Sequence, residues 1–348
     1  MRVLLTGGAG YIGSHTALLL LQRGFDVIIY DSFVNSSSKV INSIEFYLNS
    51  KKINYKLKTI VGDIRNKDCL DKVFKDSINE ANPIKSVIHF AGLKSVSQSV
   101  NNPLQYWDVN VCGTKNLLEV MSLNNCFSLV FSSSATVYGS SELVPIKENS
   151  SCRPENPYGN TKLTVETILN DLFLSNSNIW SISILRYFNP VAAHPSGLIG
   201  EDPRGIPDNL FPYITQVAIG RINTLNVYGD DWNTRDGSGI RDYIHIIDLA
   251  EGHIAALNYL KSNKFTYEII NLGSNNGYSV FEIINEFHRI TGYKVNYKVV
   301  ERRNGDIPIS IADISKANKL LSWSPTRNLK NMCLDGLNWQ IKNPNGYS

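Results

Sequence analysis

Tyr158 and Lys162 lie four residues apart and carry side chains suited to acid–base chemistry. If this stretch is helical, both side chains share one face of the helix, and Pro157 suits its first turn. A tyrosine phenol ordinarily has a pKa of about 10, and a nearby ammonium group lowers that pKa by stabilising the phenolate. The pair could therefore remove a proton from an alcohol or sugar hydroxyl. The same spacing also occurs on ordinary helix surfaces, so neighbouring motifs must decide between the two interpretations.

A serine-rich strand end supplies a third polar group. The apolar run that starts at Leu129 ends in Ser132, Ser133 and Ser134. In a doubly wound sheet the carboxyl ends of the strands face the ligand crevice. We expect Ser134 to hydrogen-bond both the reacting hydroxyl and the tyrosine phenol. A serine-rich turn that caps a helix is the alternative.

The N-terminal segment has the pattern of a dinucleotide-binding turn. A short apolar strand, residues 1–6, runs into glycines at 7, 8, 10 and 13, and a helical pattern follows over 14–22. Glycines let the backbone turn sharply and approach a diphosphate, and the helix N-terminus points N–H groups at the phosphates. An ordinary glycine turn is the alternative, but the strand–loop–helix context favours a cofactor site.

Asp31 ends the second strand, about twenty residues past the glycines. A carboxylate there accepts hydrogen bonds from the adenosine ribose and repels a 2′-phosphate, which favours NAD over NADP. Asn35 and Ser36 follow closely enough to complete the ribose and phosphate contacts. A capping or solvated turn aspartate is the competing interpretation.

The composition is that of an ordinary globular protein. Of the 348 residues, 43% are hydrophobic and 19% are charged, and the net charge of +3 calls for neither nucleic acid nor membrane as a partner. The five cysteines are scattered, which argues against disulfides or a zinc site and fits a reducing compartment. No metal is expected. Met1 runs straight into a strand with no signal peptide, so the cytoplasm is the expected location.

Alternating strand and helix patterns predict an α/β fold with a doubly wound parallel Rossmann sheet and a smaller mixed α/β C-terminal substrate domain. We expect a cofactor domain over residues 1–186, whose sheet later segments such as 266–273 can rejoin, and a substrate domain over 187–348. Residues 343–348 are expected to form a frayed tail. The predicted strands after the first two are 57–61, 86–90, 129–133 and 180–185, and the predicted helices of the first half include 68–79, 113–124 and 162–174.

Together these motifs resemble the extended short-chain dehydrogenase/reductase superfamily, and within it the NAD-dependent UDP-glucose 4-epimerase family. The resemblance covers nearly the whole chain, from Met1 to about Pro344. The glycine loop is common to many families, whereas the other matching blocks in combination are close to diagnostic. The blocks are residues 5–15, 87–94, 131–139, 185–191, 241–245 and 302–306.

The resemblance implies interconversion of UDP-glucose and UDP-galactose. Tyr158 would take the proton of the sugar 4-hydroxyl while the C4 hydride passes to tightly bound NAD, which leaves a 4-keto sugar. The sugar would turn about its diphosphate link and receive the hydride on its opposite face. Ser134 would position the 4-oxygen, and Lys162 would hold the tyrosine ionised. The family also implies a homodimer built by helices that include the one bearing Tyr158.

The resemblance assigns residues to both ligands. Two arginines suit the two phosphates of UDP, and Tyr228 would be a stacking platform for uracil. The expected cofactor residues are Gly7, Gly10, Tyr11, Ile12, Gly13, Asp31, Asn35, Ser36, Asp63, Ile64, Phe90, Ala91, Gly92, Leu93, Lys94, Ser134, Tyr158, Lys162 and Phe188. The expected UDP-sugar residues are Lys94, Ser134, Tyr158, Tyr187, Asn189, Asn209, Leu210, Asn226, Tyr228, Arg241, Tyr243, Arg303, Asp306 and Ser310.

Two positions depart from the family pattern. Ser310 stands where some members carry a tyrosine that walls off the sugar pocket, so we expect room for an acetamido group and activity on UDP-N-acetylglucosamine and UDP-N-acetylgalactosamine as well. Val109 replaces an asparagine often found near the cofactor phosphates, so that contact is expected to be lost or made by water.

Three other functions remain open at this stage. A sugar-nucleotide dehydratase or decarboxylase would need an additional acid or base where this chain has Ala135 and Thr136. A non-catalytic NAD-sensing regulator could lack the tyrosine, whereas Tyr158, Lys162 and Ser134 are all present. A simple alcohol dehydrogenase would leave the two arginines of the second domain unexplained.

Overall fold

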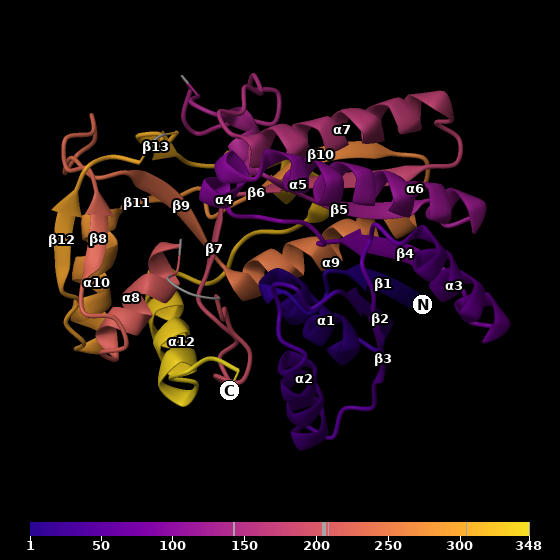
Figure 1. Cartoon of the computed structure of the whole chain (residues 1–348), viewed down its shortest axis with the longest axis horizontal. Helices are drawn as coiled ribbons and strands as arrows, with labels where there is room; N and C mark the ends of the chain where they lie inside the picture. Colours follow the sequence, from indigo (N-terminus) through magenta and orange to yellow (C-terminus); the bar gives the residue numbers. More distant parts are fainter. Residues whose placement is uncertain (142, 204–206, 208, 304, 348) are drawn as a thin grey trace.

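A computed structural model describes residues 1–141, 143–203, 207, 209–303 and 305–347 (Figure 1). Its centre is a seven-stranded, wholly parallel sheet in the order β10-β6-β5-β4-β1-β2-β3. The predicted α/β class with a doubly wound parallel sheet is confirmed. The strands are β1 (Arg2–Thr6), β2 (Asp26–Asp31), β3 (Lys56–Val61), β4 (Ile84–His89), β5 (Ser128–Ser134), β6 (Ser181–Tyr187) and β10 (Tyr267–Leu272).

Helices cover both faces of this sheet, as its apolar strands require. One layer packs with the core that holds Val3, Leu5 and Ile29, and the opposite layer packs with the core that holds Leu4 and Ile28 (Figure 1). The first layer is α1 (Tyr11–Gln22), α2 (Lys39–Ser50) and α9 (Ile246–Ser262), and the second is α3 (Lys67–Asn79), α6 (Gly113–Leu123) and α7 (Pro157–Ser175). Short connecting segments are α4 (Val96–Asn101), α5 (Pro103–Tyr106), the π-helical η1 (Trp107–Cys112) and the 3₁₀-helical η2 (Ala135–Tyr138).

The order of the strands reverses between β1 and β4. From β1 the chain first builds outward through β2 and β3, then crosses back to place β4, β5 and β6 on the other side. The loops that leave β1 and β4 therefore diverge at the carboxyl edge of the sheet, and ligands of such folds bind in this crevice.

The later part of the chain forms smaller units at this edge, on the left of Figure 1. One sheet joins β7 (Asn189–Val191), β9 (Ile240–His245), β11 (Gly277–Ser279) and β13 (Ile309–Ser310), and a second pairs β8 (Leu225–Tyr228) with β12 (Tyr297–Val300). The remaining helices are α8 (Leu210–Ala218), α10 (Val280–Thr291), α11 (Ser315–Leu321) and α12 (Leu329–Lys342). The division at residue 186 stays a prediction, and β10 and α9 of the later half pack against β6 and α1 of the first half.

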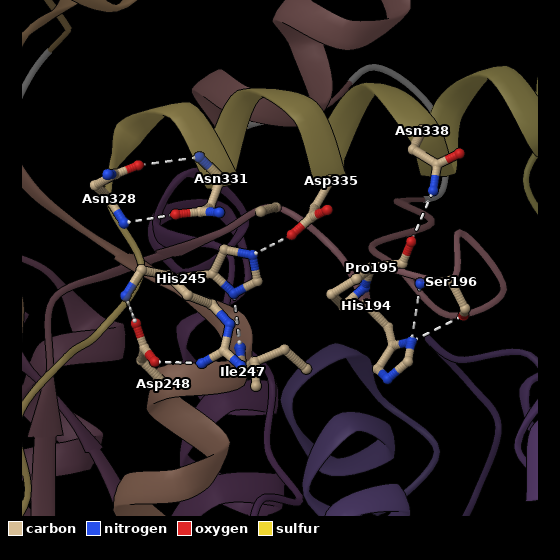
Figure 2. Close-up of polar contacts among 12 residues, drawn as sticks. His194, Pro195, Ser196, His245, Ile247, Asp248, Asn328, Asn331, Asp335 and Asn338 are labelled. Atoms are coloured by element: carbon tan, nitrogen blue, oxygen red, sulfur yellow. Dashed lines mark hydrogen bonds and ion pairs between the residues drawn. The ribbon is translucent and has the colours of Figure 1, made fainter.

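Helix α12 is fastened by side chains from several segments (Figure 2). Asn328 and Asn331 form a capping box at its start, so the first free N–H groups of the helix have partners. Asp335 accepts from His245 at 3.1 Å, and Asn338 donates to the Pro195 carbonyl at 2.9 Å. None of the described helices is both long and apolar enough to cross a membrane.

The prediction of a frayed C-terminal tail is wrong for residues 343–347, the part of the tail that the structure describes. The Tyr347 ring lies 4.7 Å from the Trp339 ring, and the Tyr347 backbone N–H donates to Asp202 at 2.9 Å. Burial of one aromatic ring and a charge-assisted hydrogen bond offset the entropy of ordering so short a tail.

Candidate active site

The three predicted catalytic side chains meet where β5 ends against the first turns of α7. Asn156 caps α7 by accepting from the Gly159 N–H, and Pro157 follows at the first helical position. The helix then places Tyr158 and Lys162 on one face, and both are buried. Ser134, the last residue of β5, lies close enough to the Tyr158 phenol to lower its pKa by hydrogen bonding.

Lys162 is anchored to the strand that carries this serine. Its ammonium donates to the Ser132 carbonyl at 2.7 Å and lies 5.9 Å from the centre of the Tyr158 ring. Burial lowers the pKa of Lys162 to about 8, and the Glu166 carboxylate opposes that shift. The amine therefore titrates near neutral pH instead of holding a permanent charge.

The pKa of Tyr158 differs from the sequence expectation. Burial raises it to about 12, and this outweighs the lowering by Ser134. The expected net lowering by Lys162 is therefore wrong for the protein alone. The physical reason is that loss of water costs a phenolate more than one hydrogen bond returns.

Thr136, a non-acidic residue that argues against a dehydratase, also contacts Ser134. Its hydroxyl and its backbone N–H both donate to the Ser134 hydroxyl oxygen, at 2.9 and 3.2 Å. Because these bonds fill acceptor positions on Ser134, they orient its own proton outward toward a further acceptor.

The glycine loop is packed too tightly for side chains. Gly7 has a φ of +70°, and a Cβ on it would lie 2.5 Å from the Ala91 backbone nitrogen. A Cβ on Gly13 would lie 2.5 Å from the Gly7 carbonyl oxygen. Gly10 caps α1 without any side-chain hydrogen bond, so the first turn of the helix keeps its N–H groups for a ligand. This cradle fits the diphosphate of a dinucleotide.

Asp31 closes the far side of the loop. Its carboxylate accepts from the Ala9 and Phe33 backbone N–H groups and from the Ser36 hydroxyl, each at 2.9 Å. It therefore stands beside the glycine loop at the end of β2, as the assignment to the adenosine ribose requires. Asn35 is exposed in the same turn.

Asn110 is a buried polar residue of this region that the sequence analysis missed. Its side chain accepts from the Leu93 N–H at 2.7 Å and donates to the Leu93 carbonyl and the Thr161 hydroxyl. It thus joins the loop after β4 to α7. It lies in π-helical η1, and this type of distortion is frequent at functional sites. The local sequence gives no sign that Asn110, and not its neighbour Val109, faces inward.

The remaining predicted cofactor residues lie in the first turn of α1 and just after β3, β4 and β6. Asp63 pairs with Arg65, which lowers the pKa of that carboxyl. Phe90 packs its ring 4.8 Å from that of His253, and Phe188 is buried, so both also serve the core. The other members of this set are Tyr11, Ile12, Ile64, Ala91, Gly92, Leu93 and Lys94.

The predicted UDP residues form paired contacts at the smaller sheets. Arg241 donates to Asp306 at 2.7 Å, and the Arg303 guanidinium lies 3.8 Å from the centre of the Tyr228 ring. Ser310 is buried and pairs in register with Arg241. Asn189 on β7 pairs with Tyr243 on β9. Asn226 lies on β8 two residues before Tyr228.

Glu201 is a second residue that the sequence analysis missed. Its carboxylate accepts from Lys94 at 2.9 Å and from Asn209 at 3.0 Å. The side chain is only 8% exposed, so a buried charge links two predicted ligand residues from distant segments. Leu210, next to Asn209, begins α8.

Tyr187 lies at the end of β6, but its hydroxyl is bound to the Ser132 hydroxyl. Burial raises its pKa well above the usual range. Its assignment to the sugar stays a prediction. Among the described residues, no cluster of three histidine, cysteine, aspartate or glutamate side chains could hold a metal ion.

Comparison with known proteins gives consistent matches. A family model described as GDP-mannose 4,6 dehydratase matches residues 4–335. The UDP-glucose 4-epimerase of Dictyostelium discoideum is 49% identical over all of this chain and 98% of its own length. A UDP-glucose 4-epimerase structure from Bifidobacterium longum, in complex with NAD⁺ and UDP, has a TM-score of 0.93 and 45% identity and covers 99% of this chain and all of its own. A Stenotrophomonas maltophila UDP-glucose-4-epimerase with bound NAD and formylated UDP-arabinopyranose has the same TM-score and 43% identity, over 99% of both chains.

Proposed function

This chain belongs to the UDP-glucose 4-epimerase family, and on that premise we propose that it inverts C4 of UDP-hexoses and so interconverts UDP-glucose and UDP-galactose. The observation that carries the proposal is the meeting of Tyr158, Lys162 and Ser134 at the end of β5, beside a glycine cradle that fits a dinucleotide. NAD, when bound, supplies a hydride acceptor that also returns the hydride.

The residues of the chain handle the proton and the geometry. Tyr158 takes the proton of the 4-hydroxyl and later gives it back. Ser134 is oriented by Thr136 and holds the 4-oxygen beside the phenol. Lys162, charged below about pH 8, stabilises the phenolate that forms.

A phenol with a pKa near 12 is almost wholly protonated at neutral pH and cannot accept a proton, so cationic neighbours must stabilise the phenolate when substrate is present. Lys162 is the protein's own cation at this point, and the positively charged nicotinamide of bound NAD would add to it. Burial favours the reaction at this point, because the exclusion of water strengthens the attraction between the phenolate and its cationic neighbours.

The diphosphate of the substrate is assigned to Arg241 and Arg303, and the ribose to Asp306. Guanidinium groups match phosphate oxygens in geometry and charge. The contacts of Asp306 support this assignment: its carboxylate accepts from Arg241, and its backbone N–H donates to the Arg303 carbonyl, so both arginines adjoin one turn. Holding UDP fixed leaves the sugar free to turn.

Acceptance of N-acetylated sugars is the finer part of the proposal. Ser310 is a small, buried residue in register with Arg241, so the wall at this point lacks a large side chain. UDP-N-acetylglucosamine and UDP-N-acetylgalactosamine are therefore proposed substrates beside the plain hexoses.

We also propose a cytoplasmic homodimer. The apolar side chains of Val100 and Leu104 are 61% and 82% exposed on α4 and α5, which pack against α7. Such side chains on adjacent short helices suit a second copy of the chain. The five free cysteines suit a reducing compartment. Light scattering would give the molar mass of two chains if the dimer forms.

The test of the function uses freshly purified protein. Nicotinamide absorbance that co-purifies and changes with UDP-galactose, together with formation of UDP-glucose without added NAD, is the expected result. Deuterium at C4 should stay on the sugar through inversion. Loss of that label to water or to external coenzyme, or formation of a dehydrated product, would rule out the proposed reaction.

A further inference from the structure

Glu166 holds the next turn of α7 beyond Lys162 against the sheet. Its side chain is 4% exposed, and its carboxylate accepts from the Ser133 hydroxyl on β5. The Arg186 guanidinium on β6, also 4% exposed, donates to both carboxylate oxygens. One buried carboxylate thus ties α7 to two neighbouring strands.

The same two strands end in residues of the candidate active site. Ser133 stands between Ser132, whose carbonyl accepts from Lys162, and Ser134. Two successive residues of β5 therefore anchor two successive turns of α7, through Lys162 and Glu166. Tyr158, Lys162 and Glu166 are spaced by four, so they share one helix face.

We infer that Glu166 is a positioning residue for the reaction: it fixes the Lys162 turn of α7 against the ends of β5 and β6 and places a carboxylate charge on the same helix face as the Lys162 ammonium. The inference rests on the proposed function of the site. A structural ion pair without effect on the reaction is the competing explanation, since buried pairs of this kind also occur far from active sites.

The charged groups around Lys162 show how the Glu166 carboxylate acts on the pKa of this lysine. The titratable groups that face it are Tyr158 and Glu166 from α7 and His89 from β4, and Arg186 from β6 is bound to Glu166. His89 is neutral, because burial lowers its pKa to about 3. Glu166 is thus the group that raises the pKa of Lys162 against the effect of burial.

The experiment compares Glu166→Gln with the wild type across pH. The amide keeps the size of the side chain and removes its charge, which leaves Lys162 easier to deprotonate. If kcat requires the ammonium, its alkaline limb should move down by about one pH unit. We expect kcat at pH 8 to fall roughly five-fold, as the ammonium fraction does when its pKa moves from about 8 to about 7, with KM for UDP-galactose and the absorbance of co-purified nicotinamide unchanged.

The matched control is Asp26→Asn. Asp26 is also a buried carboxylate bound to an arginine, Arg2, at 3.1 Å, but it lies at the amino end of the sheet. The Asp26→Asn variant should have a lower melting temperature, as Glu166→Gln does, and an unchanged pH profile of kcat. Glu166→Met/Arg186→Met removes both charges and should fold even if Glu166→Gln does not. Its downward shift should be smaller, because the repulsion between Arg186 and Lys162 is lost together with the attraction of Glu166.

The outcomes separate the two proposals. A folded Glu166→Gln or double variant with the wild-type kcat and pH profile overturns the inference and leaves the epimerase proposal intact. A wild type that does not interconvert the UDP-sugars overturns the proposed function itself. In that case the pKa of the Lys162 amine, followed by NMR of lysine-labelled protein and assigned with Lys162→Met, still tests Glu166: Glu166→Gln should lower that pKa, and an unchanged pKa would overturn the inference.

Discussion

The Lys162 ammonium donates a 2.7 Å hydrogen bond to the backbone carbonyl of Ser132, two residues before Ser134 in the same strand. A backbone carbonyl does not titrate, so it fixes the position of the amine at any pH without adding a charge. The strand thereby sets where the lysine stands relative to the tyrosine, and burial alone lowers the pKa of the lysine.

The pH dependence of turnover follows from this arrangement. Lys162 has a pKa of about 8, so the stabilising ammonium is present below that pH and is lost as pH rises through it. We expect kcat for UDP-galactose to fall above about pH 8. Lys162→Met should lower kcat roughly 100-fold, and its pH profile should no longer show the alkaline limb. A wild-type kcat that keeps rising to pH 10 would contradict the assignment.

Removing the phenol tests the proton-transfer step. Tyr158→Phe should lower kcat roughly 100- to 10,000-fold, because it removes the group assigned to take the proton of the 4-hydroxyl. Co-purified nicotinamide should remain, as measured by absorbance after denaturation. Tyr106→Phe is the control: this buried tyrosine donates to the Ser95 carbonyl, and its loss should leave kcat within about three-fold.

Two adjacent arginines offer an internal comparison. Arg303 lies over Tyr228 and is assigned to the diphosphate, whereas Arg302 lies over Trp232 and pairs with Asp231. Arg303→Met should raise KM for UDP-galactose roughly ten- to a hundred-fold, the loss of one charge-assisted contact, with little change in kcat. Arg302→Met should change KM much less. Equal increases of KM in the two variants would contradict the assignment of Arg303 to the diphosphate.

Ser310 is expected to set the range of sugars. Ser310→Tyr adds an aromatic ring at a buried position, so kcat/KM for UDP-N-acetylglucosamine should fall roughly ten-fold or more while UDP-glucose is retained. Ser310→Cys keeps a small side chain and should accept both sugars. Failure of the wild type to turn over the acetylated sugar would end this part of the proposal.

Buried histidines should make the fold sensitive to acid. Burial lowers the pKa of His15 and His89 to about 3 and of His194 and His253 to about 4. Below pH 6.5 the unfolded chain binds protons that the folded chain refuses. Stability is therefore lost as pH falls from 6.5 to about 4, by about 1.4 kcal/mol per pH unit for each such group.

Urea unfolding between pH 7.5 and 5 measures this effect. His194→Gln should give a shallower dependence of the unfolding free energy on pH than the wild type. His288→Gln, on the exposed face of α10, changes the same residue type outside the core and is the matched comparison. The same dependence in wild type and His194→Gln would show that these histidines do not govern acid stability.

The sequence by itself determined the local parts of this protein. The four-residue spacing of Tyr158 and Lys162, the glycines between β1 and α1, and Asp31 at the end of β2 were readable because helix period, glycine turns and strand ends depend on neighbours in the chain. The doubly wound sheet followed from the alternation of strands and helices. The resemblance to a family added the residues of the second half, where periodicity was weak.

Only the tertiary structure decided which distant groups share a buried environment. The contacts of Asn110 with Leu93 and of Glu201 with Lys94 join segments that no local pattern links. The opposed pKa shifts of Tyr158 and Lys162 have the same origin, because desolvation depends on all the atoms that exclude water from a site. The docked Tyr347 shows this as well, since a polar C-terminal sequence gave no hint of the ring at Trp339.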